Sequence, residues 1–162
     1  TGLVATVGRV EPSPGAGNVI AGRVTASLDG RHASDQARNN AVAALLRSAK
    51  ESAAKRGVQL TAHTQLEQSA VPMNPHLTRL LQAAAAKATF SSPTMTSGAG
   101  HDAMIVAQRL PCAMLFLRSP GGLSHHPDEA VRPQDVEAAL ATAMEFLALL
   151  RDDKATPRDD HA

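Results

Sequence analysis

The 162-residue chain has very few aromatic side chains: three Phe, and neither Tyr nor Trp. Proteins that bind single-stranded nucleic acid stack its bases on aromatic rings, and this composition leaves almost nothing for that contact. Lys and Arg number 16 against 15 Asp and Glu, which gives a formal net charge of +1. Such a balance creates no field strong enough to recruit nucleic acid or an anionic membrane surface. We therefore expect no nucleic-acid partner.

Cysteine and long apolar runs are also lacking. Cys112 is the only cysteine, so no disulfide can form within the chain, as a reducing compartment would permit. No apolar run is long enough to cross a bilayer, and no signal-peptide pattern opens the chain. We expect a cytoplasmic protein without membrane contact. Because the chain opens on Thr1 and runs at once into a strand-like segment, we also expect that it belongs to a longer polypeptide.

Residues 1–70 have the pattern of a small α+β unit. Leu3–Val10 is rich in β-branched residues, and Arg23–Arg31 alternates polar and apolar side chains, as strands do. This alternation places Arg31 at the end of a strand, on its polar face. Residues 59–67 alternate in the same way and predict a third strand.

A helix is predicted between the last two of these strands. Ser34 is suited to cap its first turn, and Gly57 supplies a stop at its carboxyl end. Apolar residues recur between them at helical spacing: Val42, Leu45, Leu46, Ala49 and Ala53. The helix is expected to cover one side of the sheet.

The second half of the chain has a different pattern of elements. Asn74 followed by Pro75 predicts a helix start, and Pro133 opens another helix near the end. The apolar residues of this last helix recur at helical spacing and are expected to face inward: Val136, Leu140, Ala143, Leu147 and Leu150. Cys112–Leu117 is apolar without alternation, which is typical of a strand buried on both faces. Residues 152–162 are charged and poor in apolar side chains, and we expect a disordered tail there.

A glycine-rich loop, Thr96–Ala103, precedes a short predicted helix. Gly98 and Gly100 would let a ligand approach the backbone, and the helix start offers free N–H groups to an anion. The plainer interpretation is that His101 and Asp102 only cap the helix. The pattern is neither a Walker loop nor a dinucleotide fingerprint.

A second loop, Ser119–Glu129, follows the predicted buried strand, at the edge where α/β proteins usually bind ligands. The neutral imidazole of His125 would suit Zn²⁺ or Mn²⁺. A catalytic zinc needs about three protein ligands, and no CxxC, HExxH or HxH pattern supplies the others. Either the remaining ligands lie outside this chain, or His125 is an ordinary exposed histidine.

Asn18 in a loop and Arg31 at a strand end are candidates for substrate binding. A guanidinium group recognises a carboxylate well. The alternative is that Arg31 pairs with Asp29 or Asp35 on a solvated face. Three further residues receive no functional role: His63, His76 and Cys112.

These segments resemble one family when taken together and in order. The matching segments are 7–12, 17–20, 24–32, 95–103 and 122–127. The first three are similar to the lid-domain signature of allantoate amidohydrolases and N-carbamoyl-L-amino-acid hydrolases. The last two resemble the two C-terminal active-site segments of that family. The resemblance runs from Leu3 to about Leu150, and Ser97–Ala103 is its most specific part.

The resemblance implies an α/β fold in two parts. Residues 1–70 would form a partial ferredoxin-like ββαβ lid, which carries the homodimer contact in this family. Residues 71–151 would form the C-terminal helix–strand–helix part of a metallopeptidase-like catalytic domain. The family binds two divalent metal ions, Zn or Mn, and hydrolyses a non-peptide C–N bond of ureido or N-carbamoyl acids through a metal-activated water.

Individual positions follow from the same resemblance. His125 aligns with the last metal ligand, and Asn18 and Arg31 align with lid residues that bind substrate in the neighbouring subunit. The segment bordering the substrate comprises Gly98, Ala99, Gly100 and His101. His126 stands where the family usually has Asn. No catalytic residue is expected within this chain, because the glutamate and the other ligands lie upstream in the family, so the chain alone should be inactive.

Two alternatives remain open at this point. The chain could be a non-catalytic dimerisation or binding module that kept the lid fold. It could also belong to a related aminoacylase or dipeptidase, since carboxylate recognition is common to all of these enzymes.

Overall fold

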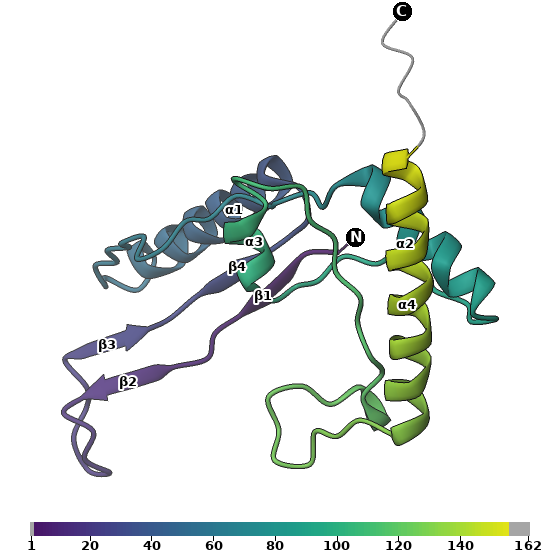
Figure 1. Cartoon of the computed structure of the whole chain (residues 1–162). Helices are drawn as coiled ribbons and strands as arrows, with labels where there is room; N and C mark the ends of the chain where they lie inside the picture. Colours follow the sequence, from purple (N-terminus) through teal and green to yellow (C-terminus); the bar gives the residue numbers. More distant parts are fainter. Residues whose placement is uncertain (1, 156–162) are drawn as a thin grey trace, which may run out of the picture. The chain divides into compact units, whose positions relative to one another are not determined.

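The structure is a computed structural model that describes residues 2–155 (Figure 1). It divides into two compact units, with the boundary between Ala70 and Val71. The first unit combines paired strands with one long helix. The second unit is built from helices and loops.

The first unit contains two short antiparallel ladders. Their strands are β1 (Val4–Thr6), β2 (Val10–Ser13), β3 (Arg23–Ala26) and β4 (Asp29–Arg31). β1 pairs with β4 and β2 pairs with β3, and between the two ladders Val7–Arg9 faces only Ser27 and Leu28. The extra residue is a bulge that interrupts the pairing, so each long strand predicted from the sequence is split in two.

Helix α1 (Asp35–Ala54) begins and ends as predicted. The Ser34 side chain accepts a hydrogen bond from Ala37 N at 3.3 Å. Gly57 follows the helix with a φ of +65°, a left-handed conformation that glycine adopts without strain. Both signals are local in sequence, and both predictions are confirmed.

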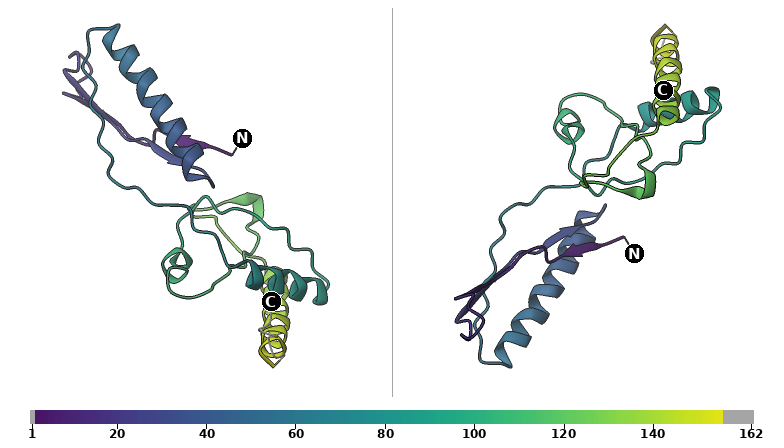
Figure 2. Two further views of the ribbon diagram at one scale, coloured as in Figure 1. Left: turned by 90° about the horizontal axis from the view of Figure 1, so that it is seen from above. Right: turned by 90° about the horizontal axis from the view of Figure 1, so that it is seen from below.

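Helix α1 lies against strand β4 and runs alongside the paired strands (Figure 2). A Cβ placed on Gly30 would lie only 3.0 Å from Val42 Cγ2 of the helix, so glycine permits this close approach. Because side chains alternate along a strand, Asp29 and Arg31 point to the face of β4 opposite α1. Helix α1 therefore lies on the side of β4 opposite the Arg31 side chain.

The predicted third strand at residues 59–67 is not formed in the described part of the chain. A strand is defined by hydrogen bonds to a neighbour, and no described strand pairs with this segment. Instead, a hydrogen bond and ion pairs join the end of segment 59–70 to the first residues of α1. Ala70 N donates to Asp35 Oδ1 at 2.9 Å, and Arg38 contacts both Asp35 and Glu67, at 3.1 and 3.5 Å.

The second unit is organised around two packed helices. Its elements are α2 (Pro75–Lys87), α3 (Asp102–Val106), the 3₁₀ turn η1 (Pro120–Gly122) and α4 (Pro133–Ala155). Asn74 Oδ1 accepts from Leu77 N at 3.0 Å, which confirms the predicted helix start. α2 packs against α4, and the buried apolar residues among those described are Ala84 and Ala85 of α2. Small side chains let the two helices approach closely.

Two predictions for this unit are wrong. Cys112–Leu117 forms no strand in the described part of the chain, and Cys112 to Leu115 are only partly buried, because no neighbouring strand pairs with them. On α4, Leu140 and Leu147 were expected to face inward but are 62% and 57% exposed. α2 covers a different face of α4 and leaves that stripe open.

The prediction of a disordered tail from residue 152 is wrong for its first four residues, which are helical. α4 extends to Ala155, four residues into the segment 152–162. Residues 156–162 lie outside the described residues.

Candidate functional site

Arg31 forms a two-pronged ion pair with Asp29 of the same strand. Its Nε donates to Asp29 Oδ1 at 2.8 Å and its Nη2 donates to Oδ2 at 2.9 Å. This hydrogen bonding raises the pKa of Arg31 and lowers the pKa of the Asp29 carboxyl. Both side chains are about half exposed, at 51% and 53%. The pairing with Asp29 foreseen as the alternative is therefore present, and an incoming carboxylate would have to share or displace Asp29.

Asn18 lies at the other end of the paired strands. It sits in the turn closed by Val19 N donating to Ala16 O at 3.3 Å, within the loop that joins β2 to β3. β3 and β4 then lead away to Arg31, over roughly 25 Å at about 3.3 Å per residue. The structure does not bring Asn18 and Arg31 together on one point of this unit (Figure 1).

The glycine-rich loop of the second unit, Thr96–Ala103, holds the His101 imidazole in a defined orientation. Ser97 Oγ lies 2.7 Å from His101 Nε2, and the His101 ring packs on Phe116 with centroids 5.3 Å apart. Ala99 N donates to Ser97 Oγ at 3.1 Å, so the serine is itself held by the loop. His101 precedes α3 but makes no side-chain capping bond. His101 therefore occupies the N-cap position without capping through its side chain, and Asp102 lies in the first turn of α3.

The glycines of this loop, Gly98 and Gly100, have open space around them. A Cβ at Gly98 would meet no atom within 4 Å, and one at Gly100 would meet only Met104 Sδ, at 4.0 Å. Ala99, between the two glycines, and His101, after them, are partly buried. The loop therefore has open space at its glycine positions, whereas the His101 side chain is partly covered.

His125 stands on a loop whose backbone is held in an unusual conformation. His125 has a φ of +56°, and its N–H donates to Glu129 Oε2 at 2.8 Å. Gly121 and Gly122 also have positive φ values, +72° and +67°, where glycine avoids the strain of a side chain. The His125 ring is exposed and makes no hydrogen bond within residues 2–155. Its ring nitrogens are thus available to a ligand from outside this unit.

His126, the departure from the family pattern, takes part in a local turn. Its Nδ1 accepts a hydrogen bond from Asp128 N at 3.1 Å. An asparagine side-chain carbonyl could accept the same bond.

One imidazole does not make a metal centre. Within residues 2–155 no three His, Cys, Asp or Glu side chains gather closely enough to hold an ion. An exposed imidazole with open nitrogens fits the role of a single ligand, since zinc and manganese both accept imidazole. The other ligands of such an ion would have to come from outside these residues.

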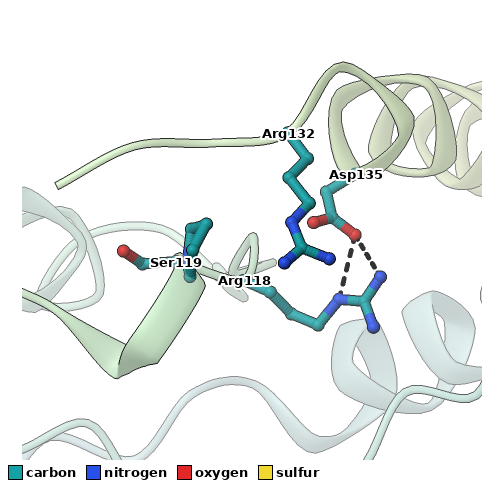
Figure 3. Close-up of a pocket in the computed structure, with 5 residues that line it drawn as sticks. Arg118, Ser119, Arg132 and Asp135 are labelled. Carbon is teal, nitrogen blue, oxygen red and sulfur yellow. Dashed lines mark hydrogen bonds and ion pairs between the residues drawn. The ribbon is translucent and has the colours of Figure 1, made fainter.

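Arg118 and Asp135 close the base of the loop that carries His125, a feature that the sequence analysis missed. Arg118 Nε donates to Asp135 Oδ1 at 2.9 Å, and a second guanidinium N–H reaches the same oxygen (Figure 3). Arg132, Ser119 and Pro120 complete a hollow of about 190 Å³ there. Asp135 is 8% exposed, so its carboxylate depends on this partner. An arginine ending an apolar run and an aspartate in a first helical turn were the only signals in the sequence.

Comparison with known proteins places the chain in a family. Residues 4–150 match the model of Peptidase family M20/M25/M40, and the chain belongs to this family. It is 36% identical over 155 residues to allantoate deiminase 2 of Glycine max. It is 32% identical over 148 residues to allantoate amidohydrolase of Escherichia coli. It is 33% identical over 149 residues to N-carbamoyl-L-amino-acid amidohydrolase of Paenarthrobacter aurescens.

These relatives are much longer than the chain. The alignments cover 91%, 91% and 92% of this chain but only 32%, 35% and 36% of the three relatives. The chain therefore spans about a third of their length. The resemblance to allantoate amidohydrolases and carbamoylases inferred from the motifs is confirmed.

Solved structures agree with the sequence comparison. An amidase of the hydantoinase/carbamoylase family from Burkholderia multivorans matches with a TM-score of 0.84 and 30% identity, over 91% of this chain and 36% of that one. Its counterpart from Burkholderia vietnamiensis gives a TM-score of 0.81 at 30% identity, with the same coverage. The predicted α/β fold class is confirmed, since the chain combines helices with small sheets and matches part of the amidohydrolase fold. No described helix has the length and apolar content to cross a membrane.

Proposed function

We propose that this chain forms the C-terminal part of a metal-dependent amidohydrolase that cleaves a non-peptide C–N bond in linear amides. The substrates would be allantoate or N-carbamoyl-L-amino acids, because the similar proteins are named for these compounds. The proposal rests on two loops of the second unit. One loop orients the His101 ring through Ser97, and the other holds the His125 backbone through Glu129.

His125 would serve as a ligand of one of two divalent metal ions, Zn or Mn. Bound metal ions would lower the pKa of a water molecule and polarise the carbonyl of the amide. The residues of this chain prepare the imidazole for that role. Glu129 holds the His125 backbone at its positive φ, and the Arg118–Asp135 pair fixes both ends of the loop.

Arg31 would bind the carboxylate that allantoate and N-carbamoyl amino acids share. Its guanidinium has five N–H donors, and the pair with Asp29 holds it in a defined orientation on the face of β4 opposite α1. Asn18 would bind substrate as well, from the opposite end of the strands. We expect these residues to act across a homodimer formed through the first unit, in the cytoplasm.

The test compares four variants in the complete gene product, using metal analysis and hydrolysis of allantoate and a panel of N-carbamoyl amino acids. His125→Ala should lose metal and activity, whereas the adjacent exposed His126→Asn should retain both.

Arg31→Ala should raise the KM by roughly tenfold or more, because a charged hydrogen bond contributes about 1.5–3 kcal/mol. Arg23→Ala, on the same hairpin, is the matched control. A wild-type protein without bound metal would refute the role of His125 as a metal ligand. An unchanged KM in Arg31→Ala would refute the role of Arg31 in carboxylate binding.

A further inference from the structure

The His101 ring is held through a single nitrogen. Ser97 Oγ lies 2.7 Å from Nε2, and Phe116 packs on the ring at 5.3 Å between centroids. No hydrogen bond reaches Nδ1 within residues 2–155. The ring is therefore oriented with Nδ1 as its open polar atom.

The position of the Ser97 proton follows from its three contacts. Ser97 Oγ accepts from Ala99 N at 3.1 Å, so its own proton can go to His101 Nε2 at 2.7 Å or to Ala99 O at 3.4 Å. The first contact is by far the shorter. If Nε2–H donated to the serine instead, the Ser97 proton would be left with Ala99 O, at 3.4 Å, as its one remaining acceptor among the described residues. The hydroxyl thus donates to Nε2, and in a neutral ring the proton then resides on Nδ1.

We propose that Ser97 is a positioning residue that holds His101 as the neutral Nδ1–H tautomer, so that the open nitrogen donates a hydrogen bond to an oxygen of the substrate. Gly98 and Gly100, in the same loop, carry no side chain that could block the approach of that oxygen, and a Cβ on Gly98 would meet nothing within 4 Å. A neutral donor suits a carbonyl or carboxylate oxygen without adding a charge to the site. The substrate part rests on the proposed function, whereas the tautomer part does not.

Nitrogen NMR of histidine-labelled chain tests the tautomer directly. The His101 signals are assigned by their loss in His101→Gln, and at pH 8 the wild type should show a protonated Nδ1 and an unprotonated Nε2. Ser97→Ala should shift the ring toward the Nε2–H form that free histidine prefers, and Ser97→Thr, which keeps the hydroxyl, should retain the wild-type form. Ser91→Ala, in the exposed approach to the loop, is the matched control. A wild-type ring that is mainly Nε2–H overturns the proposal, whatever the variants do.

Kinetics of the complete gene product test the consequence. Ser97→Ala should lower kcat/KM by about tenfold, chiefly through KM, and Ser97→Thr should restore most of it. If the tautomer is as proposed but kcat/KM is unchanged in Ser97→Ala, the positioning role is wrong and the hydrolase function stands. If no hydrolysis of any ureido or carbamoyl acid is found in the wild type, the proposed function fails while the NMR result still decides the tautomer.

Discussion

Replacing Gly30 by alanine is expected to force helix α1 away from strand β4. The added Cβ would lie 3.0 Å from Val42 Cγ2, whereas carbon atoms in favourable contact are about 3.5–4.0 Å apart. The methyl group would therefore be roughly 0.5 Å or more too close. Val42 cannot simply rotate away, since a β-branched side chain in a helix has one strongly preferred rotamer. The helix or the strand has to move.

The magnitude is a balance of two terms. Adding a carbon to a packed contact costs about 1–3 kcal/mol. Removing a glycine from the unfolded chain returns about 0.4–1 kcal/mol, because alanine has fewer unfolded conformations to lose. The net expectation is a loss of about 0.5–2 kcal/mol in the free energy of unfolding, measured by urea denaturation followed by circular dichroism.

Two further variants isolate the cause. Gly17→Ala is the control, because a Cβ there meets nothing within 4 Å, and it should leave stability unchanged or slightly increased. Val42→Ala should cost less in the Gly30→Ala background than in the wild type, because it removes the crowding methyl. Equal stability of Gly30→Ala and Gly17→Ala, or strict additivity with Val42→Ala, would refute the close-contact explanation.

Three other outcomes can be measured in the same way. Ser34→Ala should cost about 1 kcal/mol, because the first turn of α1 loses its cap, and an unaltered unfolding midpoint would count against the observed Ser34 bond. The backbone hydrogen bond from Ala70, with a smaller effect of Arg38, keeps the pKa of Asp35 below its usual value. The folded state then binds fewer protons than the unfolded state. The stabilisation that the ionised Asp35 carboxylate gives is therefore complete above about pH 4 and is lost at lower pH. Asp35→Asn should make the acid dependence shallower, and an unchanged pH profile would contradict this. Arg118→Ala should destabilise by about 1–3 kcal/mol, because it leaves the buried Asp135 carboxylate without its partner, and Arg132→Ala beside it should have little effect.

Helix starts were predictable from the sequence because their signals are local. Ser34 and the Asn74–Pro75 pair act on backbone groups within one turn, and the structure shows both side chains accepting the expected bonds. The strand at 59–67 was not predictable, because alternation describes only the two faces of a segment. A strand also needs a neighbour, and no described segment provides one.

The candidate site was foreseen only in part, for a similar reason. Glycines and a histidine in Thr96–Ala103 marked a loop that could border a ligand, but the direction of the His101 ring depends on Ser97 and on Phe116, fifteen positions further along. The Arg118–Asp135 pair likewise joins residues that are far apart in the sequence. Pairings of this kind depend on how the chain folds back, which residue types alone do not encode.

The open stripe on α4 connects these observations. Leu140, Met144 and Leu147 lie on one helical face and are 62%, 68% and 57% exposed. A face of this composition normally packs against another element, and α2 covers a different one. The spacing of these residues thus correctly predicted an apolar helix face, but it did not predict which element packs against that face. Under the proposed function the cover is the rest of the catalytic domain, and the same assembly would bring the missing ligands to His125.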